Sequence, residues 1–111
     1  MVESTEIKRG DIVLVGFDPA KGQEIKKARP CVVVSPDELN KHLSTCIVAP
    51  MTTGSHSYPF RIECRFKGKL GHVVLDQIRT VDQIRLIKPL GRLPDPVLER
   101  TLNVLQEMFA L

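Results

Sequence analysis

Residues 11–35 read DIVLVGFDPAKGQEIKKARPCVVVS, which is two short apolar runs separated by a long polar loop. The runs, Asp11–Phe17 and Pro30–Ser35, are rich in valine and are bounded by Gly, Pro, Asp or Ser, as strands usually are. Both are apolar at successive positions. This pattern indicates strands that are covered on both faces, or strands of a small closed barrel with something packed outside.

Similar runs of six residues recur further along the chain. They are Thr45–Pro50, Phe60–Arg65 and Gly71–Asp76, and a further strand or pair of strands is expected within Ile84–Leu93. The loops between these strands should carry the function, chiefly residues 18–29 and 51–59.

Helical patterns are confined to two places. Pro36–His42 is expected to form one or two turns after the second strand. Near the carboxyl end, Asp95 is a good N-cap and Pro96 suits the first helical position. Apolar pairs then step by four, three and four residues from Val97 to Phe109, which gives one apolar stripe facing the barrel. The sequence predicts one mainly β domain, residues 1–111, with a short crossover helix and a terminal packing helix.

The net charge of +3 is modest, but its placement is uneven. Residues 21–29 and residues 61–69 each carry +3, which fits solvated loops or contacts to a polyanion equally well. One Tyr, four Phe and no Trp argue against a protein that works mainly by stacking bases on aromatic rings.

The cysteines and histidines do not form a metal-binding pattern. Cys31, Cys46 and Cys64 have no Cys-x-x-Cys spacing and are expected to be reduced core residues. The three histidines are scattered, so no zinc site is expected. Residues 1–10 lack the apolar stretch of a signal peptide and no run is long enough to span a membrane, so a reducing cytoplasm is the expected location.

Several short motifs occur together in a particular order. They are FDPAKGQE at 17–24, Arg29-Pro30, APMTT at 49–53, YPF at 58–60 and DQIR at 76–79. With this order and spacing the chain resembles the MazF/PemK (Kid, ChpB-like) family over roughly residues 8–110. The resemblance implies an SH3-like barrel of the CcdB/MazF/Kid type. It also implies a homodimeric toxin of a type II toxin–antitoxin system that inhibits translation.

Toxins of this family cut single-stranded mRNA at short preferred sequences, which leaves a 2′,3′-cyclic phosphate and a 5′-hydroxyl. The RNA supplies its own 2′-hydroxyl nucleophile, so no metal and no cofactor is expected, and positioning and electrostatic stabilisation carry the catalysis. A disordered segment of the cognate antitoxin is expected to fill the RNA groove.

Three residues are the expected catalytic set. Arg29 has a permanent charge and a planar fork of donors for phosphate oxygens, and Pro30 biases it toward an extended backbone. Thr52 matches the family's catalytic threonine and can donate to a non-bridging oxygen. Glu24 is expected to act as the general base or to orient Arg29.

The choice of general base stays open between Glu24, Asp76 and His56. The Kid-like branch of the family uses a His in the first loop and an Arg two residues before the Asp of the Asp-Gln motif. This chain has Gln23 and Val74 at those two positions, while Asp76 matches. The MazF-like set of Glu24, Arg29 and Thr52 therefore fits better.

Other polar residues of the matching motifs are expected to bind RNA, through phosphates or through the edges of unstacked bases. They are Lys21, Gln23, Lys27, Thr53, His56, Ser57, Asp76, Gln77 and Arg79. Gln77 and Arg79 could equally serve the dimer interface.

Two other functions are compatible with a small barrel. A CcdB-like toxin binds DNA gyrase without catalysis and needs no cluster of Arg29, Thr52 and Glu24. An SH3-like module for proline-rich peptides needs an aromatic groove, which one Tyr and no Trp make improbable.

Overall fold

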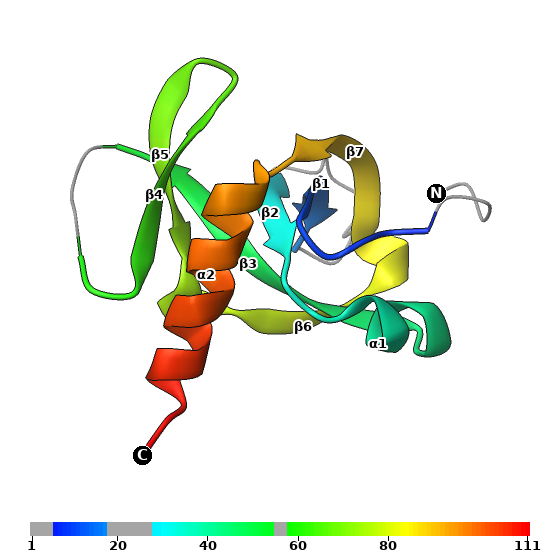
Figure 1. Cartoon of the computed structure of the whole chain (residues 1–111). Coiled ribbons are helices and arrows are strands. Elements are labelled where there is room, and N and C mark those ends of the chain that lie inside the picture. The colour runs from blue at the N-terminus through cyan, green and yellow to red at the C-terminus, as the bar shows by residue number, and fades with distance from the viewer. Residues whose placement is uncertain (1–5, 18–27, 55–57) are drawn as a thin grey trace.

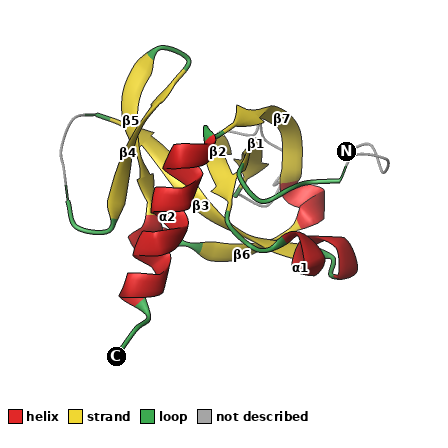
Figure 2. Cartoon of the chain, in the orientation of Figure 1, coloured by secondary structure: helices red, strands yellow, loops and turns green. Residues whose placement is uncertain are grey.

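The computed structural model describes residues 6–17, 28–54 and 58–111, and within them the chain is mainly β. The strands are β1 (Asp11–Gly16), β2 (Ala28–Val33), β3 (Thr45–Thr53), β4 (Arg61–Phe66), β5 (Lys69–Val74), β6 (Arg79–Asp82) and β7 (Leu86–Arg92). The helices are α1 (Asp37–His42) and α2 (Asp95–Met108), and η1 (Leu75–Gln77) and η2 (Gln83–Arg85) are short 3₁₀ turns. The predicted fold class is confirmed (Figures 1 and 2).

All the strand pairs are antiparallel, in the order β4-β5-β3-β2-β1-β7. β6 also pairs with β3, along residues 45–48, whereas β5 pairs with residues 51–53 of β3. The long β3 therefore joins two parts of the sheet. Its two halves have different neighbours.

Two apolar cores explain why the strands are apolar at successive positions. Ile12, Val32 and Ala49 belong to one core, onto which the apolar face of α2 packs. Val13, which follows Ile12, and Cys31, which precedes Val32, belong to the second core. Because neighbouring strand residues point to opposite faces, both faces of β1, β2 and β3 are covered. Figure 1 shows α2 in front of the sheet, next to β4.

The short helix α1 is fixed to the barrel by polar side chains. The Gln83 amide lies within hydrogen-bond distance of the carbonyls of Asn40 and Thr45, at 2.9 Å each. Asn40 is buried and bonds to Ser35 just before the helix. Among the described residues, no helix has the length and apolar character to cross a membrane.

Three expectations about the elements were wrong in detail. α2 begins at Asp95 itself, so its N-cap is Pro94 and not Asp95. β6 was not expected as a strand. The third strand does not end at Pro50 but continues to Thr53, because the backbone of β5 pairs with it there. Thr52 and Thr53 are thus strand residues and not loop residues.

Candidate functional site

The cleft that contains Arg29 and Thr52 lies between β2, the end of β3 and the β4–β5 hairpin. It has a volume of about 600 Å³, and Thr53, Phe66 and Gly71 also line it. The register of β2 and β3 explains why Arg29 and Thr52 line the same cleft. The last pair of this register is Cys31 with Pro50. Continued for two residues beyond its last pair, this register would set Arg29 opposite Thr52. The structure therefore brings the two predicted residues to one place.

Arg29 is exposed at the start of β2, where it pairs with Val15 of β1. None of the described residues accepts a hydrogen bond from the Arg29 guanidinium or forms an ion pair with it. The expected ion pair with Glu24 lies outside the described residues. Arg29 thus lines the cleft without a hydrogen-bond or ion-pair partner among the described residues.

The backbone around Thr52 is held by an unusually close strand contact. Thr52 pairs with His72 and Thr53 pairs with Gly71 on β5. A Cβ atom on Gly71 would collide with the carbonyl oxygen of Thr52. Only glycine permits this approach of β5, so Gly71 helps to set where Thr52 lies.

Two cations of this cleft were not among the predicted site residues. Lys67, in the turn between β4 and β5, and Lys69, the first residue of β5, line it. With Arg29 they give the described lining a charge of +3, and no carboxylate is among the described lining residues. The positive stretch 61–69 was the available signal, but sequence alone did not show that its turn folds back beside Arg29.

Cys31 is a buried residue of β2, two positions from Arg29. Burial raises the pKa of the Cys31 thiol to about 12, while the nearby guanidinium groups of Arg29 and Arg79 act against this rise. All three cysteines are buried and free, as expected. Within the described ranges, no three His, Cys, Asp or Glu side chains are grouped closely enough to hold a metal ion.

Asp76, Gln77 and Arg79 do not line this cleft. Asp76 and Gln77 are exposed on η1, and Arg79 is exposed at the start of β6. The Arg79 guanidinium stacks on the Phe17 ring, 4.6 Å from its centre. Asp76 is bound by Arg61, whose hydrogen bonds hold the pKa of that carboxyl below its ordinary value.

The remaining predicted residues cannot be placed. Glu24, Lys21, Gln23, Lys27, His56 and Ser57 lie outside the described residues. Of the other histidines, His42 lies within 2.9 Å of the Glu38 carbonyl at the end of α1, which fits the expected structural role. His72 is buried in β5, with 3% of it exposed.

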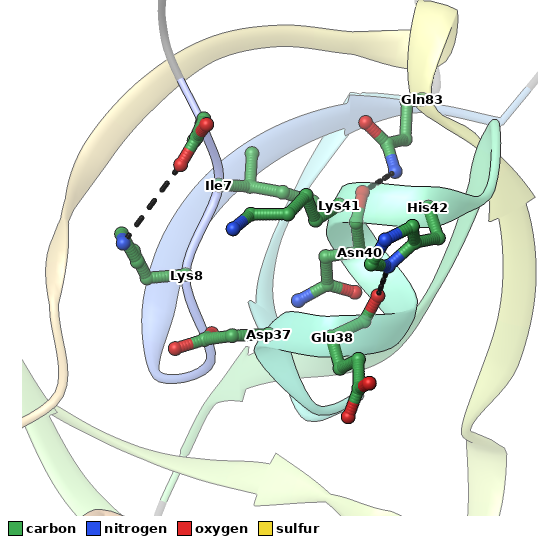
Figure 3. Close-up of a pocket in the computed structure, with 9 residues that line it drawn as sticks. Ile7, Lys8, Asp37, Glu38, Asn40, Lys41, His42 and Gln83 are labelled. Carbon is green, nitrogen blue, oxygen red and sulfur yellow. Dashed lines mark hydrogen bonds and ion pairs between the residues drawn. The ribbon is translucent and has the colours of Figure 1, made fainter.

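A second cleft, of about 660 Å³, lies around α1. Figure 3 shows Lys8, Asp37, Glu38, Lys41 and His42 around it. With Glu6 also among its lining residues, its described charge is −1 with neutral histidine.

Known proteins resemble this chain over nearly its whole length. The family model for PemK-like, MazF-like toxins of type II toxin–antitoxin systems matches residues 8–109. The chain is 40% identical over 113 residues to the endoribonuclease toxin ChpB of Escherichia coli (strain K12), covering 96% of this chain and 97% of that protein. It is 38% identical over 72 residues to the endoribonuclease toxin MazF of the same organism, covering 65% of each.

A solved structure agrees with these sequence matches. The MazE–MazF crystal structure (Form-II) from Deinococcus radiodurans superposes with a TM-score of 0.78 at 27% identity, covering 94% of this chain and 96% of that chain. The order of motifs, the barrel and the three comparisons agree. The chain belongs to the family of PemK-like, MazF-like toxins of type II toxin–antitoxin systems.

Proposed function

We propose that this chain is an endoribonuclease toxin that cuts single-stranded mRNA by attack of the RNA's own 2′-hydroxyl. The observation that carries the proposal is that Arg29 and Thr52 line one cleft whose charged lining residues, among those described, are all cations. Such a cleft favours a phosphate over a neutral or cationic ligand. The toxin family and the endoribonuclease relatives support the same activity.

In the proposed reaction the cleft binds the scissile phosphate. The 2′-hydroxyl loses its proton to a base and attacks phosphorus, and the 5′-oxygen leaves and takes up a proton. The products are a 2′,3′-cyclic phosphate and a 5′-hydroxyl. Arg29 donates to the non-bridging oxygens as they gain charge, and Thr52 adds a hydroxyl donor. No step requires a metal ion.

The general base remains Glu24 in this proposal, with His56 as the alternative. Asp76 stays a third candidate, although the hydrogen bonds from Arg61 lower the pKa of its carboxyl. A carboxylate with a lowered pKa accepts the 2′ proton less readily at neutral pH.

The remaining predicted residues grip the substrate. We assign phosphates and base edges to Lys21, Gln23, Lys27, Thr53, His56, Ser57, Asp76, Gln77 and Arg79. The proposed active form is a homodimer of a single toxin domain in the reducing cytoplasm. A cognate antitoxin silences it by laying a disordered segment in the RNA groove. The solved MazE–MazF complex is a precedent for an antitoxin partner.

A CcdB-like toxin that binds DNA gyrase is the weaker candidate, because the matched relatives are endoribonuclease toxins. One experiment separates the two. Purified protein is incubated with a long single-stranded RNA in EDTA, and the new ends are mapped. We expect discrete cuts with cyclic phosphate ends that disappear in Arg29→Ala and persist in Lys41→Ala, a control in the α1 cleft. Uncut RNA with arrested DNA supercoiling would support the gyrase function instead.

A further inference from the structure

Tyr58, Arg61 and Asp76 form a polar cluster at the start of β4 that the catalytic scheme does not use. Arg61 donates from Nε to Asp76 Oδ1 at 3.1 Å and from its terminal nitrogen to Oδ2 at 3.2 Å. The same guanidinium lies over the Tyr58 ring, 4.9 Å from its centre. The ring and the carboxylate therefore hold the Arg61 plane in one orientation.

The strand register places this cluster on the same face as Thr52. Thr52 pairs with His72 of β5, and Arg61 of β4 pairs with Val74, two residues further along β5. Cross-strand partners share a face, and so do residues two apart on one strand. Typical strand spacing and rise put the Cα atoms of Thr52 and Arg61 about 12 Å apart. A short RNA segment bound at Thr52 can span this distance.

The charge of the cluster selects a base over a phosphate. Asp76 neutralises Arg61, so a phosphate would meet an adjacent carboxylate there. A flat guanidinium beside an aromatic ring is instead a surface on which unstacked RNA bases stack. Tyr58 is 52% exposed, and the side chains of Arg61 and Asp76 are 25% and 43% exposed, so a base can reach all three.

Asp76 adds a preference among bases. An ionised carboxylate has about four lone-pair sites, of which Arg61 occupies two. The others can accept a hydrogen bond from an exocyclic amino group, which uracil lacks.

We propose that Tyr58, Arg61 and Asp76 form a specificity subsite for an amino-bearing base next to the scissile phosphate. The base stacks on Tyr58 and Arg61 and donates from its amino group to Asp76. This inference rests on the proposed ribonuclease function and deepens it.

The test measures equilibrium binding of short RNA oligonucleotides that contain the mapped cleavage sequence. A 2′-deoxy nucleotide at the cleaved position removes the nucleophile, so that the oligonucleotides stay intact. In one set each amino-bearing base is replaced in turn by its counterpart without the amino group, such as purine for adenine. In a second set each base is removed in turn.

At one position near the cleaved bond, loss of the amino group should weaken wild-type binding about tenfold or more. Asp76→Ala should bind the two oligonucleotides alike. Tyr58→Leu should weaken binding about 5- to 150-fold, except to the oligonucleotide that lacks that base. Arg92→Ala is the matched control, since Arg92 of β7 forms a comparable exposed ion pair with Asp11 of β1. It should bind every oligonucleotide like the wild type.

The subsite is rejected if Tyr58→Leu and Asp76→Ala bind all oligonucleotides within twofold of the wild type, or lose the same factor at every position. Thermal unfolding of each variant separates a binding defect from misfolding, and the exposed Tyr58 should tolerate leucine. If these two variants bind like the wild type while the protein still cuts RNA in a way that depends on Arg29, only the subsite proposal is rejected. A wild type that cuts no RNA sinks both proposals.

Discussion

The two clefts of this molecule are similar in size and opposite in chemistry. The cleft around α1 has about 660 Å³ and the cleft beside β3 about 600 Å³. In the α1 cleft, acids and bases are mixed and much of the polar lining is already engaged. Asp37 accepts from the Arg9 backbone, Gln83 donates to several carbonyls, and Lys8 lies 3.9 Å from Glu6 (Figure 3).

The cleft beside β3 differs because the polar side chains among its described lining residues are cations and threonine hydroxyls. Arg29, Lys67 and Lys69 line it together, and no carboxylate among the described lining residues offsets their charge. The comparison teaches that volume does not identify the site here. What identifies it is a set of like charges that the described barrel leaves without acidic neighbours.

After the loss of cuts expected for Arg29→Ala, Thr52→Ala should have the largest effect among the single changes that test this contrast. Removing one preorganised donor to a developing anion commonly lowers the rate by ~10²–10³-fold. The measurement is single-turnover cleavage of a short RNA at saturating protein. Thr80→Ala, an exposed threonine on β6, is the control and should cut at the wild-type rate. A Thr52→Ala rate within threefold of the wild type would remove Thr52 from the reaction.

Gly71→Ala should damage both stability and cleavage, because the new Cβ collides with the Thr52 carbonyl. Overpacking of this kind typically costs about 1–3 kcal/mol of unfolding free energy. Denaturant unfolding measures that cost, and single-turnover cleavage measures the displacement of Thr52. We expect a rate loss of about tenfold in protein that is still fully folded. A stable variant with full activity would show that this strand contact does not position Thr52.

The lysine pairs of the two clefts should differ in how RNA binding depends on salt. Binding to single strands weakens with salt by roughly 0.7 log units per log unit of salt for each phosphate neutralised. The double change Lys67→Gln and Lys69→Gln should therefore lower the slope by ~1.4. The matched double change Lys8→Gln and Lys41→Gln in the α1 cleft should leave it unchanged. Equal slopes for both variants would contradict the assignment of the RNA to the cleft beside β3.

The Arg61–Asp76 pair should have a small effect on stability at acid pH. The pKa of the Asp76 carboxyl is lower in the folded state than its ordinary value of 3.8. The pair therefore stabilises the fold at pH values above 3.8, and this contribution is lost as the pH falls through the folded-state pKa. Between pH 6 and pH 3, the melting temperature of the wild type should fall slightly more than that of Asp76→Asn. Parallel melting curves at the two pH values would show that the pair contributes nothing.

Much of the fold could be predicted from the sequence because the strands carry their own pattern. Runs that are apolar at successive positions require cover on both faces, and the two cores supply it. β6 was missed because RTVD is short and largely exposed, with only Val81 buried. Its pairing with β3 is set by tertiary contacts and leaves no local signal.

The site was predictable where a motif carried it and not where folding assembled it. Arg29 and Thr52 came from the family motifs, and the β2–β3 register explains why they meet. Lys67 and Lys69 were missed because only the β4–β5 turn brings them to Arg29. The pairing of Arg61 with Asp76 joins residues 15 apart in sequence, and no spacing rule indicates it.

A double-mutant cycle on single-turnover cleavage tests most directly whether Arg29 and Thr52 act on one phosphate. The rates of the wild type, Arg29→Ala, Thr52→Ala and the double variant are compared on one RNA. If both residues stabilise the same phosphate, the double variant should cut no more than about tenfold slower than the worse single variant, because groups acting as a unit are not additive. Losses that multiply in full would mean that the two residues act independently, and would contradict the shared site.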